Sequence, residues 1–334
     1  METKILGTTT EEIDQAAQIL SAGGLVAFPT ETVYGLGADA LNEKAVAKVY
    51  AAKGRPSDNP MIVHISSKDD LSMLTVEITE DMEKLSDRFW PGPMTMIVKR
   101  RSIVPDVTTG GLDTVGVRMP SAPEALELIR RAGCPVAAPS ANLSGKPSPT
   151  CSRHVIDDLN GRIDAILCGG QCQVGIESTV IDMTGPQPMI LRPGIITRED
   201  FERVLEKPVL LDPTLNRRPE EGAEEKLTPK APGMKYKHYA PKAEMIVFEG
   251  ESRAVEQAIE AEKRKRETEG QKVCVILFVD NEQENAAHDL FARLRQADQN
   301  GADVILSAAL TERGIGFSVM NRMLKSAGYN IKKV

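Results

Sequence analysis

A segment rich in proline, glutamate and lysine divides this chain of 334 residues into two unequal parts. Between Asp212 and Pro241 the sequence has almost no aliphatic residues before MKYKHY, which is typical of a linker. A chain of this length commonly forms two domains, because a single hydrophobic core stops growing beyond about 250 residues. We therefore expect a first domain over 1–211, a linker over 212–243 and a second domain over 244–334.

The two parts differ in how predicted strands and helices alternate. After the linker, the apolar runs MIVF, VCVILFV and VIL alternate with helical segments at Ser252–Glu269, Ala286–Ala297 and Phe317–Ala327. This β-α-β-α-β-α pattern predicts a small parallel sheet. Before the linker, strands and helices mix without regular alternation and the loops are long. The fold class is therefore α/β, with an α+β-like first domain.

The stretch Phe28–Pro60 concentrates polar chemistry in the first part. The run LVAF leads into three hydroxyl residues (Thr30, Thr32 and Tyr34) and two spaced glycines, which we expect in a turn. A helical segment then ends at Lys53 and Arg55. Hydroxyls that face a Lys-x-Arg pair would suit a small anionic ligand such as a nucleotide. The alternative is a solvated pair of cations at the end of a helix, where the helix dipole favours them.

Further polar residues interrupt apolar segments downstream. Arg118 and His64 each lie in an apolar strand pattern, where a buried charge needs a partner. A carboxylate ligand or an internal Asp or Glu would both serve Arg118. Ser140, Asn142 and Ser148 follow a short apolar strand in a loop that could carry function or be a plain turn.

Composition weighs against several classes of protein. The formal net charge of −7 argues against generic nucleic-acid binding, which needs a basic surface. Five cysteines and four histidines without ligand spacing predict no metal site, and Cys168 and Cys172 are expected to be idle thiols. The start METKILGTTTEE has no apolar signal segment, and no run approaches the roughly 20 residues of a membrane span. A cytoplasmic protein without membrane contact is expected.

A set of motifs occurs in one order along the first part and is followed by KHYAP in the linker: PTETVYGLG, KGRP, MIVHI, WPGP, GVRMP, PSANLSG, GIESTVID and LRPG. This order resembles the YrdC-like family of L-threonylcarbamoyladenylate synthases, in its long two-domain form. The resemblance covers essentially the whole chain. It implies a twisted mixed sheet with a concave, positively lined cleft, followed by a small Rossmann-like domain. Because the dinucleotide glycine fingerprint is absent, no dinucleotide is expected there.

The resemblance also implies a reaction. L-threonine, bicarbonate (or carbon dioxide) and ATP would give threonylcarbamoyl-adenylate and pyrophosphate, which makes the protein a nucleotidyltransferase. A partner protein would then transfer the threonylcarbamoyl group to the adenosine next to the anticodon of tRNA. Because every species is anionic, catalysis should consist of positioning and charge stabilisation without a covalent enzyme intermediate. Mg²⁺ is expected to be held by the nucleotide and water.

The residues that the resemblance assigns fall into three groups. The basic and polar catalytic group comprises Lys53, Arg55, Ser140 and Asn142. The expected threonine site comprises Thr32, His64, Arg118, Ala138 and Ser178. The linker is expected to cross the active site. The expected ATP contacts are Arg55, Asn59, Thr114, Ser140, Ser148, Arg192 and, from the linker, Tyr236, with His238 and Tyr239 as further candidates.

Two other functions use the same features. A double-stranded RNA-binding or ribosome-maturation module would place RNA in the positive cleft, although the acidic balance and the lack of aromatic platforms weigh against it. Weak RNA binding remains an open expectation. Carbamoyl transfer in hydrogenase maturation or antibiotic synthesis is the other alternative. Such proteins carry additional zinc-finger or kinase-like domains, for which this chain has no room.

Overall fold

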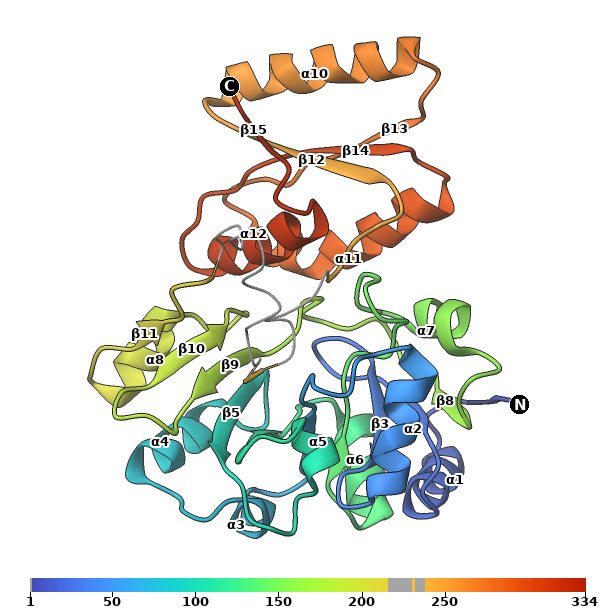
Figure 1. The fold of residues 1–334 in the computed structure, drawn as a ribbon, viewed down its shortest axis with the longest axis vertical. Helices are drawn as coiled ribbons and strands as arrows, with labels where there is room; N and C mark the ends of the chain where they lie inside the picture. Colours follow the sequence, from blue (N-terminus) through green and yellow to red (C-terminus); the bar gives the residue numbers. More distant parts are fainter. Residues whose placement is uncertain (1, 216–229, 232–237) are drawn as a thin grey trace.

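The computed structural model of the protein describes residues 2–215, 230–231 and 238–334 (Figure 1). Its described part holds an eleven-stranded sheet in the order β1-β8-β2-β3-β7-β4-β6-β5-β9-β10-β11 and a four-stranded sheet in the order β13-β14-β12-β15. The predicted fold class, a mixed α/β sheet followed by a smaller parallel α/β unit, is confirmed.

The large sheet combines parallel and antiparallel neighbours. For example, β4 pairs with β6 in parallel, whereas β5 and β6 are antiparallel. Its strands are β1 (Lys4–Leu6), β2 (Val26–Phe28), β3 (Gly35–Asp39), β4 (Ile62–His64), β5 (Met94–Lys99), β6 (Thr114–Arg118), β7 (Val136–Ala137), β8 (Ala165–Leu167), β9 (Thr179–Asp182), β10 (Met189–Arg192) and β11 (Leu210–Leu211).

Helices connect and cover these strands. They are α1 (Thr10–Ser21), α2 (Glu43–Lys53), α3 (Leu71–Leu74), α4 (Glu80–Phe89), α5 (Asp106–Thr109), α6 (Pro123–Ala132), α7 (Ser152–Leu159) and α8 (Arg198–Leu205), with a 3-10 turn at Lys68–Asp70. Local signals set several ends, because side chains satisfy the free backbone groups there. Asn42 caps α2, which stops at Gly54 with φ 62°, so Arg55 leaves the helix in a new direction.

The two spaced glycines of the opening stretch are not in a turn, which corrects the sequence-based expectation. Gly35 and Gly37 belong to β3, which pairs antiparallel with β2 through Phe28↔Gly35 and Val26↔Gly37. A Cβ atom on Gly37 would lie 2.8 Å from Cγ1 of Val136 and 2.9 Å from Cε1 of Phe28. Glycine is therefore required here because neighbouring side chains fill the space. The turn itself is the preceding loop, which carries Thr30 and Thr32.

The second unit follows the predicted alternation and adds one strand. Its elements are β12 (Glu244–Glu249), α10 (Ser252–Thr268), β13 (Val273–Ile276), α11 (Gln283–Gln299), β14 (Val304–Ala308), α12 (Ile315–Ser326) and β15 (Ile331–Lys333). All its strand pairs are parallel. In Figure 1, α10 covers the outer face of this sheet, and α11 and α12 cover the face toward the large sheet.

The two units share apolar packing. The core between the small sheet and helices α11 and α12 also contains Val33 and Ile176 from the first unit and Tyr239 from the end of the linker. Gly175, with φ 82°, lies against the backbone of α11, where an added Cβ would be 2.3 Å from the carbonyl oxygen of His288. Helices α11 and α12 are thus packed directly onto loops of the large sheet.

Three expectations from the sequence concern the cysteines, a metal site and membrane-spanning helices. All five cysteines lie within the described residues and are free thiols. Within that part of the chain, no group of three or more His, Cys, Asp or Glu side chains is placed to hold a metal ion. None of the helices that the structure describes has the length and apolarity to cross a membrane.

Candidate active site

A small cavity lies where loops of the large sheet meet the end of the linker. It offers about 50 Å³ of room, which corresponds to roughly three to five water molecules. Most of its lining residues have polar or charged side chains. The lining residues are Thr30, Thr32, Val33, Gly35, Arg55, Ile62, His64, Arg118, Ala138, Pro139, Ser140, Glu177, Ser178, Arg192, His238 and Tyr239.

The sheet topology brings these distant residues together. His64 ends β4 and Arg118 ends the parallel neighbour β6, in direct register with each other. Ser178 immediately precedes β9, and Arg192 ends β10, which is antiparallel to β9. Because neighbouring strands deliver their ends to one side of the sheet, segments that are far apart in the sequence converge on one site. All five residues predicted to form a threonine site line this cavity (Thr32, His64, Arg118, Ala138 and Ser178).

Arg118 has an internal acidic neighbour. Its Nη2 atom lies 2.7 Å from Oε1 of Glu31, and both side chains are only 5% exposed. The two groups do not align as a hydrogen bond, so Nε and Nη2 of Arg118 remain without a hydrogen-bond acceptor. Of the two partners considered from sequence, the internal acid is present, and Arg118 still has free donors for a carboxylate ligand.

Two further arginines add positive charge to the cavity. Arg192 donates from Nε to the carbonyl oxygen of Ser178 at 3.0 Å and from Nη2 to its Oγ, also at 3.0 Å. Arg55 donates from Nη2 to the carbonyl oxygen of Pro60 at 3.0 Å, and its Nε has no acceptor. Burial lowers the pKa of both guanidinium groups to about 10, so both remain protonated at neutral pH.

His64 contributes a neutral imidazole. Burial, followed by the charge of Arg118, lowers the pKa of His64 to about 3. Its Nδ1 atom is buried and has no hydrogen-bond partner. Beside it, the hydroxyls of Thr30 and Thr32 are 2.9 Å apart, and Thr30 donates to the carbonyl oxygen of Val33. The cavity therefore presents uncharged polar groups next to its arginines.

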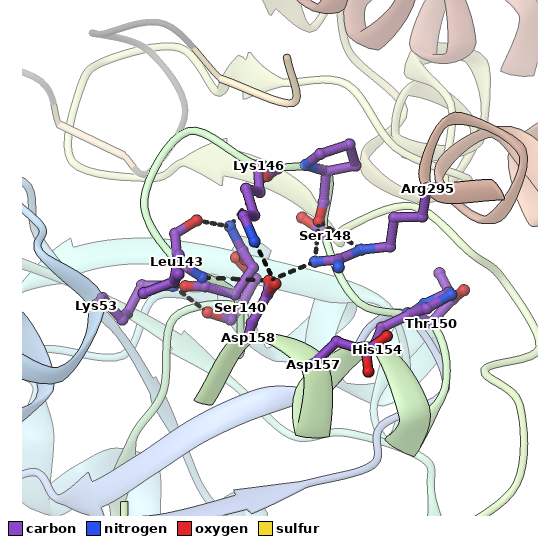
Figure 2. A network of polar contacts seen from close by, with 12 residues as sticks. Lys53, Ser140, Leu143, Lys146, Ser148, Thr150, His154, Asp157, Asp158 and Arg295 are labelled. Carbon is purple, nitrogen blue, oxygen red and sulfur yellow. Dashed lines mark hydrogen bonds and ion pairs between the residues drawn. The ribbon is translucent and has the colours of Figure 1, made fainter. Parts of the chain in front are cut away.

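Two other members of the predicted catalytic group, Lys53 and Asn142, do not line the cavity. Lys53, which is 3% exposed, donates from Nζ to the backbone carbonyls of Ser140 and, at 2.6 Å, of Asn142 (Figure 2). Burial, with a smaller effect of Arg55, holds the pKa of Lys53 well below its usual range. Asn142 donates to the carbonyl of Leu143 at 2.8 Å. Of these residues only Ser140 lines the cavity, and Lys53 holds the loop that carries it.

The remaining ATP candidates are dispersed. Asn59 is buried beside Arg55 and has an unpartnered Oδ1 atom. Ser148 donates to Oε1 of Glu177 at 2.5 Å. Thr114 begins β6, at the opposite end of the strand from Arg118, and does not line the cavity. Tyr236 lies outside the described residues. His238 and Tyr239 do line the cavity, and their rings are 5.4 Å apart.

Two acidic residues of the site were missed by sequence reasoning. Glu31 pairs with Arg118, and Glu177 lines the cavity with 7% of its surface exposed. Burial opposes ionisation of Glu177, but Arg322 and Arg192 outweigh it and hold its pKa below the ordinary value. Both carboxylates lie inside motifs that were singled out, PTETVYGLG and GIESTVID. The presence of an acidic residue inside a motif that is expected to bind anions could have indicated both of these site residues.

Two family models match the chain. One, which carries the description "Telomere recombination" and represents Sua5, YciO and YrdC proteins, matches residues 18–194. The other, described as the C-terminal domain of threonylcarbamoyl-AMP synthase, matches residues 196–328. Together they span most of the chain and both of its units.

Individual proteins resemble the chain along its full length. A threonylcarbamoyl-AMP synthase of Pyrococcus abyssi is 48% identical over 329 residues, which cover 96% of this chain and 95% of that protein. One of Bacillus subtilis is 43% identical and covers 97% of this chain and 95% of its own length. The crystal structure of P. abyssi Sua5 in complex with L-threonine superposes with a TM-score of 0.93 at 47% identity, over 99% of this chain and 100% of that one.

Proposed function

The chain belongs to the Sua5, YciO and YrdC family and has the C-terminal domain of its threonylcarbamoyl-AMP synthases, and we propose that its cavity makes L-threonylcarbamoyladenylate from L-threonine, bicarbonate and ATP. Pyrophosphate is the second product. The enzyme is a nucleotidyltransferase that catalyses the first step of threonylcarbamoyladenosine modification of tRNA.

One observation supports this function most directly. Buried polar atoms in proteins nearly always have hydrogen-bond partners. Here such atoms without partners gather at the cavity, on Arg55, His64, Arg118 and His238. Among the residues that the structure describes, three arginines contribute to the wall, against one lining carboxylate, Glu177. A polar, anionic ligand would satisfy these donors, and both the amino acid and ATP have that chemistry.

We assign this small cavity to L-threonine. Its small volume suits an amino acid better than a nucleotide, since cavities for larger ligands usually measure about 300–1,000 Å³. Arg118 would bind the carboxylate through its free donors, and Ser178 and Thr32 would contact the polar groups of the substrate. Ala138 leaves space for a methyl group. The relative that shares this fold binds L-threonine in its crystal structure.

ATP would approach the same wall from the linker side. Arg55, Arg192 and Ser140 face the cavity and would contact the phosphates. The proposed nucleotide site extends beyond this small cavity. It would be completed by Asn59, Thr114, Ser148 and Tyr236. Mg²⁺ would arrive on the triphosphate, because the described residues offer no cluster of carboxylates to hold it.

The proposed chemistry joins the two ligands. The threonine amine attacks the carbon of bicarbonate or carbon dioxide and gives a carbamate, with loss of water from bicarbonate or of a proton when carbon dioxide reacts. A carbamate oxygen then attacks the α-phosphorus of ATP, and the bond to pyrophosphate breaks. The guanidinium groups of Arg55 and Arg192 would stabilise the charge that develops in this step. Lys53 would act by fixing the loop with Ser140 and Asn142, because its ammonium group is occupied by their carbonyls.

The wider context is also part of the proposal. The product is a reactive mixed anhydride, so a second protein must transfer its threonylcarbamoyl group to tRNA. A cytoplasmic location would place the enzyme beside that partner and its tRNA substrates. The alternative of a double-stranded RNA module is not favoured. Arg118 and Arg192 are only 4% and 6% exposed and could not contact the backbone of a duplex.

Mass spectrometry of the product provides a test. Incubation of the purified chain with ATP, L-threonine and carbon-13 bicarbonate should give an adenylate that contains threonine and one heavy carbon. The Arg118→Met variant should give little of it, because the carboxylate of threonine loses its partner. An adenylate without the heavy carbon, or with equal yield in the absence of threonine, would refute the proposed reaction.

A further inference from the structure

Two buried arginines of the second unit contact loops that carry site residues of the first. Arg322 in α12 is 0% exposed and Arg295 in α11 is 7% exposed. Complete burial of an arginine is uncommon, because a charge removed from water must be paired and fully hydrogen-bonded. Both side chains meet this requirement mainly with groups of the first unit, and Arg322 makes one further hydrogen bond within α12, to the carbonyl oxygen of Ser318. Their position suggests a role beyond holding the two units together.

Arg322 binds both segments that flank strands β9 and β10. Its Nε atom lies 3.2 Å from Oε2 of Glu177, just before β9. Its Nη1 atom donates to the carbonyl oxygen of Pro193, the residue after Arg192. One turn earlier in α12, Ser318 donates from Oγ to the carbonyl oxygen of Gly194 at 2.7 Å. One face of α12 therefore fixes the two segments that deliver Glu177 and Arg192 to the cavity.

The carboxylate of Glu177 makes this contact chemically important. One of its oxygens accepts from Ser148, and the other faces Arg322. Glu177 also lines the cavity and is electrostatically coupled to Arg192. Without Arg322, this carboxylate would draw Arg192 toward itself and would repel an incoming phosphate. Arg322 balances the charge of Glu177 and so weakens the pull of this carboxylate on Arg192.

Arg295 fixes the neighbouring loop in a similar way (Figure 2). Its Nη2 atom donates to the carbonyl oxygen of Pro147 at 2.6 Å and to Oδ2 of Asp158 at 2.7 Å. Asp158 in turn accepts from Nζ of Lys146 at 2.8 Å. This loop leads directly into Ser148. The second unit thus contacts each of the segments around Glu177.

We propose that Arg322 is a positioning residue of the ATP site, which acts through Glu177 on Arg192 and Ser148. The inference rests on the proposed function, because it takes ATP as the anion that Arg192 binds. The second unit then contributes to substrate binding as well as to stability. A residue that only joined the two units would affect ATP and threonine alike. A residue that balances the charge of Glu177 should instead change the affinity for ATP more than the affinity for threonine.

The test compares binding of a non-hydrolysable ATP analogue and of L-threonine by calorimetry, in the full-length chain. Arg322→Met should raise the dissociation constant of the analogue at least about ten-fold and that of threonine less than about three-fold. Arg266→Met is the matched control, since Arg266 lies in α10 and pairs with Glu262 and Glu244 within the second unit. The control should leave both dissociation constants unchanged.

A second substitution separates charge from packing. Adding Glu177→Gln to Arg322→Met removes the unpaired carboxylate, so the double variant should bind the analogue at least about three-fold more tightly than Arg322→Met. If Arg322→Met does not fold, Arg322→Lys replaces it. That variant should weaken analogue binding about three- to ten-fold, without an equal effect on threonine.

Different outcomes overturn different claims. Unchanged analogue binding in folded Arg322→Met, equal losses for both ligands, or no recovery in the double variant would refute the role of Arg322. A wild-type chain that binds both ligands but releases no pyrophosphate in response to threonine would refute the proposed function instead. Thermal unfolding of each variant shows whether it is folded.

Discussion

His64 and Arg118 are direct neighbours in register on the parallel strands β4 and β6, and both side chains face the same cavity. This arrangement places an imidazole beside a permanent positive charge in a buried setting. The charge and the burial both disfavour a second cation. The histidine is therefore a neutral hydrogen-bonding group, and the arginine supplies the charge for an anionic ligand.

The neutral state of His64 predicts a dependence of stability on pH. The pKa of His64 is about 3 in the folded chain, against an ordinary value near 6.5, so the unfolded chain binds the extra proton in between. The contribution of neutral His64 to stability is complete above pH 6.5 and is lost as the pH falls toward 3. Below pH 6.5, the unfolding free energy should fall by about 1.4 kcal/mol per pH unit from this group alone. His64→Asn should remove that part of the slope in urea unfolding at pH 7, 6 and 5. Parallel pH profiles for both proteins would contradict it.

Arg118 should control threonine affinity. Arg118→Met removes charge-assisted hydrogen bonds worth about 1.5–3 kcal/mol, so the dissociation constant for L-threonine should rise roughly 10- to 150-fold. The change also leaves Glu31 buried without its partner, which lowers stability. The double variant Arg118→Met/Glu31→Gln should regain stability and still bind threonine weakly. Calorimetry and urea unfolding measure the two effects, and recovery of both in the double variant would be evidence against a carboxylate contact.

Replacement of Lys53 should lower stability more than replacement of Arg55. Both Lys53→Met and Arg55→Met should abolish most product formation. Lys53→Met should also lower the unfolding free energy by about 1–3 kcal/mol, because two buried carbonyls lose their donor. Arg55→Met should cost less, since Arg55 makes longer contacts with the carbonyls of Asn59 and Pro60, at 3.3 and 3.0 Å, and its Nε is unpartnered. Product yield and urea unfolding distinguish the two. Equal stability losses would argue against separate roles.

Arg295 should stabilise the loop before Ser148. Arg295→Met leaves the buried carboxylate of Asp158 with Lys146 as its remaining cationic partner, and should lower the unfolding free energy by about 3–5 kcal/mol. Amide hydrogen exchange should accelerate over residues 143–146. The control is Arg153→Met, because Arg153 forms an ion pair with Asp157 on the same helix and its side chain is 76% exposed. That control should change stability by less than about 1 kcal/mol. An equal effect of both substitutions would exclude a special role for Arg295.

Local signals predicted much of the fold. The helical segment expected to end at Lys53 and Arg55 is α2, and its end at Gly54 depends only on neighbouring residues. The alternating pattern after the linker predicted the small parallel sheet. Strand β15 was not predicted, since the sequence IKK lacks an apolar pattern and the strand is held by pairing with β12.

For the site as well, some features could be predicted from the sequence and others could not. The five residues expected around threonine came from separate motifs, and the sheet brings all of them to one cavity. Side-chain pairs between distant segments could not be predicted. Arg322 and Glu177 are 145 residues apart, and neither sequence neighbourhood indicates the other. The carbonyl partners of Lys53 were missed for the same reason, because backbone acceptors leave no trace in residue identity.

Release of pyrophosphate from ATP by the purified chain tests the central claim most directly. The rate should be high when both L-threonine and bicarbonate are present and near background when either is omitted. Arg55→Met should release little under all conditions. Pyrophosphate release that proceeds at the same rate without threonine would contradict the assignment of this cavity to threonylcarbamoyl-adenylate synthesis.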